Sequence, residues 1–177
     1  MKNFSLKFID ILIGIVLGLG FQWWPLFTSP WQFTAFVFAY FDIADYWIDY
    51  SPSLKKFPPK REIDVMLDLA IMFMVFLYIY ATTVSPIYFL AVFAVWRTLD
   101  YFWLLSSKYE YNPSGLDKVY VDTWIRFNII ESTIAGILIG VTFFFKIQPL
   151  TTIIIFIVIR IAMRVLASLR YKKVHFA

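Results

Sequence analysis

Cysteine is absent from this 177-residue chain, and histidine occurs once, at His175 near the C-terminus. Without thiol groups the chain can form neither disulfide bonds nor thiolate metal sites. A bound metal would therefore need oxygen ligands, which hard divalent cations prefer. We expect no cofactor or, at most, a divalent cation. We expect His175, which lies in a basic tail, to be solvated.

Charged residues are scarce as well. They make up 16% of the chain, whereas a typical soluble domain has about a quarter. Hydrophobic residues make up 61%, and the mean hydropathy is +0.73. The net charge of +4 does not indicate nucleic-acid binding, because the basic residues are scattered among the connections between apolar stretches. The composition predicts an integral membrane protein whose main partner is the lipid bilayer.

Six apolar stretches are each long enough, at about 20 residues, to cross a bilayer as a helix. They cover residues 8–27, 31–50, 65–83, 86–106, 126–145 and 149–168. The sequence thus predicts an all-α, polytopic membrane protein. It has six transmembrane helices in a single domain that covers residues 1–177.

The connections between these stretches differ in charge. Three are short and nearly uncharged, and they alternate with longer, basic ones. One side carries only Lys146, whereas the other carries twelve cationic residues: Lys2, Lys7, Lys55, Lys56, Lys60, Arg61, Lys108, Lys118, Arg126, Arg170, Lys172 and Lys173. Cytoplasmic loops are enriched in lysine and arginine. We therefore expect a multi-pass protein of the cell membrane with both termini in the cytoplasm.

Two features of spacing indicate helix pairing. One pattern occurs twice: an acid, a proline 18 residues later, and an arginine 11 residues after the proline. The first series is Asp68, Pro86 and Arg97, and the second is Glu131, Pro149 and Arg160. This pattern favours three helical-hairpin repeats, as internal repeats are common in transporters. Glycines four residues apart, which let membrane helices pack closely, occur at Gly14, Gly18, Gly136 and Gly140.

Three aspartates share one face of the second predicted helix. Asp42, Asp45 and Asp49 lie at positions i, i+3 and i+7, after a long run of apolar and aromatic residues. Charged side chains inside a bilayer are costly, and they usually pair and face the interior of the bundle. Apart from Asp49, which we expect at the interface, the predicted spans hold six acids and three arginines: Asp10, Asp42, Asp45, Asp68, Asp100, Glu131, Arg97, Arg160 and Arg164.

This excess of acids leaves two interpretations open. One is a structural network of buried ion pairs that includes Asp100 and Arg164, with Arg97 and Arg160 bound to acids such as Glu131 and Asp68. The other is an acidic vestibule, open to the cytoplasm, in which a cation or a proton offsets the extra carboxylates. The expected residues of this vestibule are Asp10, Asp42, Asp45, Asp64, Asp68 and Glu131.

Three short segments resemble the six-helix potassium-channel family of lysosomes and bacteria. Phe8-Ile9-Asp10 is similar to the Phe-Ser-Asp of that family's first-helix signature, with Ile9 in place of the serine and Phe4 in place of an arginine. Residues 46–50, YWIDY, and the MLDLA segment around Asp68 are similar to parts of its second and third helices. The resemblance covers the first 70 residues and implies an oligomer whose first helix lines an ion pore.

Two pairs of acids resemble the metal-binding motif of the CDP-alcohol phosphotransferases, which are also six-helix membrane proteins. The pairs are Asp42-x-x-Asp45 and Asp64-x-x-x-Asp68, and Tyr46 stands where that family has a glycine. The resemblance implies a lipid head-group transferase in which these four aspartates hold Mg²⁺ and the CDP diphosphate at the cytoplasmic face.

These patterns support three hypotheses of function. The first is a channel for cations or protons, or a small transporter, with the acidic vestibule as its pathway. The alternatives are the head-group transferase and a non-catalytic subunit of a larger membrane complex. The sequence contains no Gly-rich phosphate loop and no Ser-His-Asp set, so it favours a non-enzyme and identifies no catalytic residue. We expect a homo-oligomer or a part of a larger membrane complex.

Overall fold

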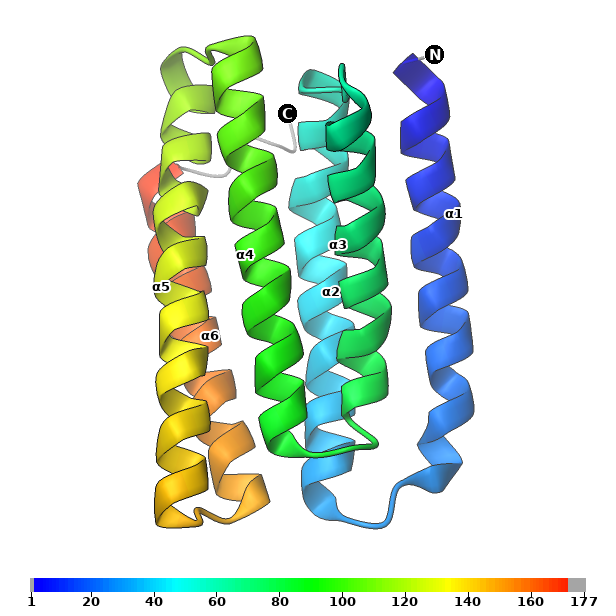
Figure 1. The fold of residues 1–177 in the computed structure, drawn as a ribbon, viewed down its shortest axis with the longest axis vertical. Coiled ribbons are helices and arrows are strands. Elements are labelled where there is room, and N and C mark those ends of the chain that lie inside the picture. Colours follow the sequence, from blue (N-terminus) through cyan, green and yellow to red (C-terminus); the bar gives the residue numbers. More distant parts are fainter. Residues whose placement is uncertain (1, 172–177) are drawn as a thin grey trace.

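The computed structural model describes residues 2–171 and the side chains of residues 7–170, so that His175 and the basic tail lie outside the described residues. The described part forms six α-helices and one short 3-10 segment, without β-strands (Figure 1). They are α1 (Lys2–Gly20), η1 (Phe21–Leu26), α2 (Pro30–Lys56), α3 (Glu62–Ala81), α4 (Pro86–Tyr111), α5 (Gly115–Phe145) and α6 (Pro149–Tyr171). The predicted all-α class is confirmed.

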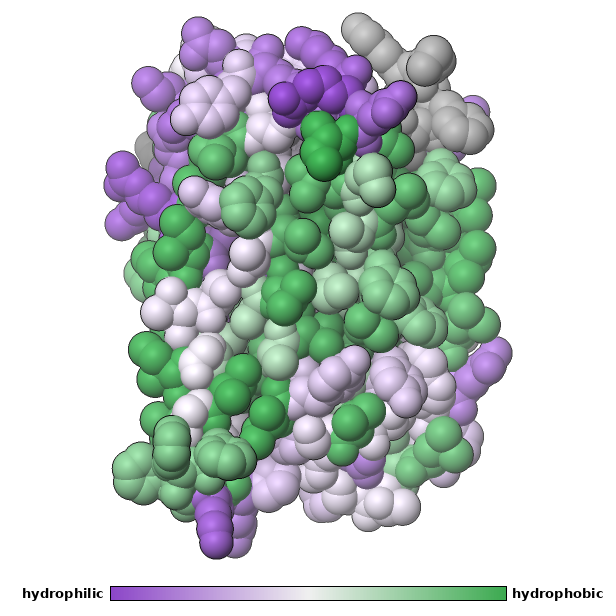
Figure 2. Space-filling model, in the orientation of Figure 1, coloured by the Kyte–Doolittle hydropathy of each residue, from purple (hydrophilic) through white to green (hydrophobic). Residues whose placement is uncertain are grey.

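Five of the described helices are long and apolar enough to cross a membrane: α1 together with η1, α3, α4, α5 and α6. The remaining helix, α2, has 27 residues but is less apolar, because Asp42, Asp45 and Asp49 lie between its middle and its end. On the face shown in Figure 2, apolar side chains cover the middle and hydrophilic ones gather at the upper end. Apolar helices of membrane length are thus confirmed for five segments, and a sixth span stays a prediction.

Polar residues and prolines set where the helices begin. Pro86 is the first residue of α4, and the Ser85 hydroxyl before it accepts a hydrogen bond from a backbone N–H of the first turn at 3.1 Å. The Gln32 side chain closes the start of α2 by accepting a hydrogen bond from the Ser29 N–H at 3.1 Å. Proline suits the first helical position, because the N–H that it lacks would have no helical partner there.

Two helices extend well beyond their apolar stretches. The predicted connections at 51–64 and 106–126 are reduced to residues 57–61 and 112–114. Helix α2 continues through Pro52 to Lys56, and α5 begins at Gly115. These helices are therefore longer than the predicted spans, and the spans themselves stay a prediction. Hydrophobicity marks only the part of a helix that suits a bilayer, whereas backbone hydrogen bonds can extend the helix into polar surroundings.

Five helices form a closed ring in the order α2, α3, α4, α5 and α6, because α6 packs back against α2. Helix α1 lies outside the ring, against α3 and α2, and it stands at one edge of the bundle in Figure 1. We call the end of the bundle where α2, α4 and α6 finish the basic end. The ring directs one face of each of its helices inward, which is where the buried charges lie.

An aromatic layer fills the ring between these charges and the end opposite the basic end. The rings of Tyr78 and Phe89 stack with centroids 4.4 Å apart, and those of Phe93 and Phe156 meet edge to face at 4.8 Å. Trp96 completes the layer, and none of the five side chains is more than 2% exposed. The layer separates the polar interior from the opposite end of the bundle.

Candidate functional site

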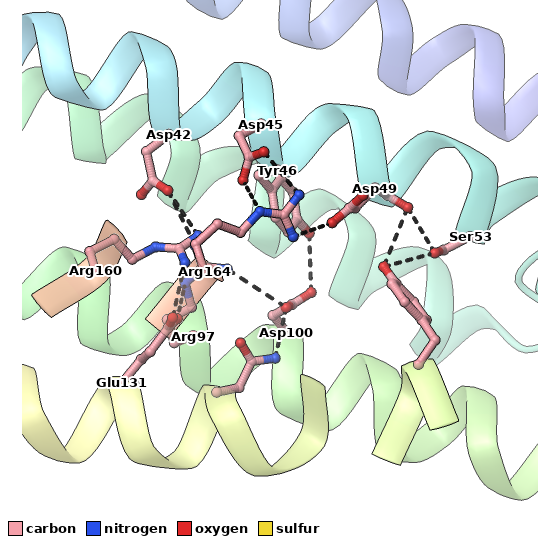
Figure 3. Close-up of polar contacts among 12 residues, drawn as sticks. Asp42, Asp45, Tyr46, Asp49, Ser53, Arg97, Asp100, Glu131, Arg160 and Arg164 are labelled. Atoms are coloured by element: carbon pink, nitrogen blue, oxygen red, sulfur yellow. Dashed lines mark hydrogen bonds and ion pairs between the residues drawn. The ribbon is translucent and has the colours of Figure 1, made fainter. Parts of the chain in front are cut away.

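Two arginines meet two acids at the centre of the ring. Arg160 of α6 contacts Asp42 of α2 at 2.9 Å (Nη2–Oδ1) and Glu131 of α5 at 3.0 Å (Nη1–Oε1). Arg97 of α4 contacts the same acids, with Nε 3.1 Å from Glu131 Oε2 and Nη2 3.8 Å from Asp42 Oδ1. Figure 3 shows these side chains converging from their helices. Together they connect α2, α4, α5 and α6 at one level of the bundle.

The two arginines are removed from solvent. The side chain of Arg97 is 1% exposed and that of Arg160 is 4% exposed. The guanidinium of Arg97 also lies 4.4 Å from the centroid of the Trp96 ring, a distance suited to a cation–π contact. Because a guanidinium does not lose its proton in proteins, each of these groups needs a negative partner in the interior.

Asp100 lies beside this centre, nearly one turn along α4 towards the basic end. Its carboxylate accepts hydrogen bonds from Asn128 Nδ2 at 2.7 Å and from the Tyr46 hydroxyl at 3.1 Å. The guanidinium of Arg97 is 3.9 Å away. Asp100 is therefore held by two neutral donors and only loosely by a charge.

Arg164 joins α6 to α2 about one turn closer to the basic end than Arg160. It holds Asp45 through two contacts, Nε–Oδ2 at 2.5 Å and Nη2–Oδ1 at 2.9 Å, and it also binds Asp49. Its guanidinium lies over the Trp124 ring, 5.3 Å from the centroid. Two-point contacts of this kind fix the orientation of a carboxylate as well as its distance.

A small cavity runs beside these contacts. Its volume is about 20 Å³, which is enough for about one water molecule. Near it, the Ser53 hydroxyl donates to the backbone carbonyl of Asp49 at 2.8 Å, and its oxygen lies 3.2 Å from the Tyr120 hydroxyl, which continues the polar groups towards the basic end. The lining comprises Asp45, Tyr46, Asp49, Tyr50, Ser53, Arg97, Asp100, Trp103, Leu104, Tyr120, Trp124, Arg160 and Arg164.

The charges of this interior do not balance. We call the charge network two neighbouring groups of ion pairs with five acids and three arginines in all. Arg97 and Arg160 pair with Asp42, Asp100 and Glu131, and Arg164 pairs with Asp45 and Asp49. With every group ionised, it carries two more negative than positive charges. Excess charge in a buried site is unfavourable unless a proton, a cation or water compensates it. Two carboxylates of the network therefore have no arginine charge of their own to balance them.

Two acids of α3 that the sequence associates with this site are held elsewhere. Asp68 does not contact an arginine; it accepts a hydrogen bond from the Tyr50 hydroxyl at 2.6 Å. Asp64 accepts hydrogen bonds from the Arg61 side chain at 3.1 Å and from the Ser106 hydroxyl at 2.7 Å, at the basic end. The predicted convergence of Asp68 with the aspartates of α2 is therefore not found, because Asp42, Asp45 and Asp49 pair with the arginines of α6 whereas Asp68 binds Tyr50.

Asp10 and the paired glycines also lie apart from the charge network. Asp10 is exposed on α1, outside the ring. Gly14, Gly18 and Gly136 are exposed, and a Cβ added at any of them, or at Gly140, would meet no atom within 4 Å. These glycines therefore make no close helix contact within the described chain. The predicted role of the glycines would need a second chain.

Several polar residues of the site are not among its predicted members. Tyr46 and Asn128 hold Asp100, and Tyr120 extends the polar groups towards Ser53. Asn128 carries the best sequence signal, because it lies three residues before Glu131 and thus on the same face of α5. The tyrosines resemble the aromatic residues that surround membrane-helix ends, so their sequence gives no sign of a buried role.

Among the side chains of residues 7–170, no group of three or more acidic or histidine side chains is placed to hold a metal ion, and the expected divalent cation stays a prediction. No protein-family model matches the chain, and no curated protein or solved structure is significantly similar to it. The resemblances to the potassium channels and to the phosphotransferases likewise stay predictions.

Proposed function

We propose that the chain is a six-helix integral membrane protein that carries protons along the charge network, with the basic end facing the cytoplasm. The observation that carries this proposal is the imbalance of five acids against three arginines in the charge network, of which four acids and two arginines are buried. A proton that moves among the carboxylates compensates this excess without needing a larger site.

The size and lining of the cavity favour a proton over a metal cation or a nucleotide. A volume of about 20 Å³ accepts one water molecule but no CDP group. The three acids that line the cavity, Asp45, Asp49 and Asp100, each already face one of its arginines, which leaves no free carboxylate there to bind a cation such as K⁺. A proton can instead pass between carboxylates, hydroxyl groups and water, and chains of acids serve as proton relays in pumps and transporters.

The aromatic layer supplies a barrier in this proposal. The charge network and Ser53 span 12 residues of α2, from Asp42 to Ser53, which is about 17 Å of helix, or roughly half of a bilayer. Beyond Asp42, the buried rings of Tyr78, Phe89 and Phe156 fill the ring of helices. In this proposal, protons reach the charge network from the basic end, and the aromatic layer blocks their way to the opposite end. Transport therefore requires the aromatic layer to open.

Proton flux into liposomes tests the proposal. The full chain is reconstituted with a pH-sensitive dye inside, and a K⁺ gradient with valinomycin drives protons inward. We expect acidification above that of empty liposomes, and a rate at least about tenfold lower for Asp100→Asn and Asp45→Asn. Asp117→Asn is the matched control, because Asp117 binds Lys56 at the exposed basic end.

Two results would overturn the proton pathway. One is acidification no faster than in empty liposomes for a chain that is shown to be folded. The other is an equal rate in Asp100→Asn, Asp45→Asn and the control. A flux of K⁺ or Na⁺ that depends on Asp45 would replace the proton with a metal cation as the transported ion.

A further inference from the structure

A hollow lies between α5 and α6 at the basic end, separate from the charge network. Its volume is about 350 Å³, and it is lined by Val119, Asp122, Thr123, Arg126 and Arg170. Its position matters because both helices leave the apolar part of the bundle at this level. An exposed hollow with two arginines at such a level is suited to an anion from the membrane surface.

The two arginines of this hollow are not engaged by acids. Arg126 and Arg170 are exposed, and neither forms an ion pair with a described side chain. The guanidinium of Arg170 lies over the Phe127 ring, 5.4 Å from its centroid, which leaves its N–H groups at the ring's edge available. The one acid of the hollow, Asp122, is neutralised by Lys108 at 2.7 Å. The hollow therefore presents net positive charge.

We propose that this hollow binds the phosphate group of an anionic phospholipid. Two guanidinium groups from neighbouring helices match a phosphate, since each can donate two parallel hydrogen bonds to its oxygens. Such a contact connects the last turn of α6 to α5. The proposal rests on the membrane placement and orientation given above, and it does not require the proton pathway.

The residues below the hollow favour a lipid over free phosphate. Ile130 lies one turn deeper than Arg126 along α5, and Leu166 lies one turn deeper than Arg170 along α6. Both are exposed, by 43% and 53% respectively. An acyl chain can follow these two side chains into the bilayer while its phosphate stays with the arginines. Free phosphate would gain nothing from them.

Lipid titration of the full chain in detergent tests the proposal. We measure the binding of phosphatidylglycerol by native mass spectrometry and by the melting temperature, with phosphatidylcholine, diacylglycerol and inorganic phosphate in parallel. We expect phosphatidylglycerol to bind most tightly. Each arginine near an anionic membrane surface contributes about fivefold in affinity, so Arg126→Gln with Arg170→Gln weakens binding about 25-fold. When lysine replaces glutamine at position 126 of this double variant, the restored charge recovers part of the lost affinity.

Lys55→Gln is the matched control, because Lys55 is an exposed cation of the same end outside the hollow. Equal weakening by Lys55→Gln would mean general attraction between charges and would overturn the site. Equal stabilisation by inorganic phosphate and by phosphatidylglycerol would overturn the choice of a lipid. If the chain binds phosphatidylglycerol as expected but passes no protons, only the proton pathway is refuted. If the chain stays folded in water without detergent, the membrane placement on which both proposals rest is refuted.

Discussion

Arg97 is the residue with the most acids around it. Its guanidinium lies near Glu131 at 3.1 Å, Asp42 at 3.8 Å and Asp100 at 3.9 Å, and its side chain is 1% exposed. In an interior of low polarity, an ion pair is favourable only while both partners are present, because a lone charge keeps the full cost of its desolvation. The geometry therefore makes Arg97 and its acids dependent on one another.

Replacing Arg97 with alanine tests this dependence. The change leaves Glu131 with Arg160 alone, and the loss of one partner from a buried pair costs about 3–5 kcal/mol of stability. We expect Arg97→Ala to lower the folded yield and the temperature of aggregation in detergent. The double variant Arg97→Ala with Glu131→Gln should recover part of the loss, because it removes the uncompensated acid. A single variant that behaves like the wild type would mean that water already compensates this charge.

At this scale the sequence predicts which residues are charged and buried but not all of their partners. The equal spacing of Arg97 and Arg160 after their prolines predicts similar depth, and in the structure both arginines contact the same acid, Glu131. The same spacing makes Asp68 the equivalent of Glu131 and predicts that it, too, binds an arginine. In the structure, Asp68 instead accepts a hydrogen bond from the Tyr50 hydroxyl. The difference arises from the order of the helices in the ring, because α3 does not face α6, and the spacing of residues along the chain contains no information on that order.

Helix α1 is held to the ring at its last turn. The Tyr40 hydroxyl of α2 donates a hydrogen bond to the backbone carbonyl of Leu17 at 2.6 Å, where the carbonyls of a helix end lack partners within the helix. Gly20 is buried at this contact, and a Cβ placed there would clash with the Tyr40 hydroxyl and lie 2.9 Å from Ile79 Cγ2. The glycine that packs closely is therefore Gly20, which has no partner four residues away in the sequence pattern.

Alanine substitutions along α1 distinguish these glycines. We expect Gly20→Ala to destabilise the chain by about 1–3 kcal/mol, because the added methyl group forces Tyr40 or Ile79 to move. The matched substitution Gly14→Ala adds a methyl group to open space and should be neutral or stabilise the helix by about 0.5–1 kcal/mol. Thermal unfolding in detergent measures both. If Gly14→Ala were the more damaging change, α1 would pack against a second chain through the glycines predicted from the sequence.

The elements themselves were predictable in number but not in length. Each apolar stretch contains a helix, and the prolines at positions 86 and 149 begin helices as expected. The ends near residues 56 and 115 were not predictable from hydropathy, because α2 and α5 continue through polar sequence. The positions of the charges on the helix faces could be derived from the helical period alone, whereas the closing contact of α6 with α2, which gathers those charges, is a property of the whole ring.

The whole molecule is asymmetric along its long axis. The charge network, the hollow with Arg126 and Arg170, and the exposed lysines Lys55 and Lys60 all lie towards the basic end, whereas the aromatic layer and Lys146 lie towards the other. A polar pathway that opens towards the basic end must face the compartment into which that end projects. The orientation in the membrane therefore decides from which side protons and anionic lipids reach the two proposed sites.

Cysteine labelling tests this orientation, and the absence of native cysteine gives it no background. Lys55 at the basic end and Val84 in the turn between α3 and α4 are both exposed, so a cysteine at either position is accessible to a reagent that cannot cross membranes. Because ten cationic residues of the described chain flank the basic end and Lys146 flanks the other, the positive-inside rule predicts that the basic end faces the cytoplasm. We expect intact cells to label Val84→Cys but not Lys55→Cys, and permeabilised cells to label both. Labelling of Lys55→Cys alone in intact cells would invert the molecule, and the proposed proton entry and lipid hollow would then face the outside.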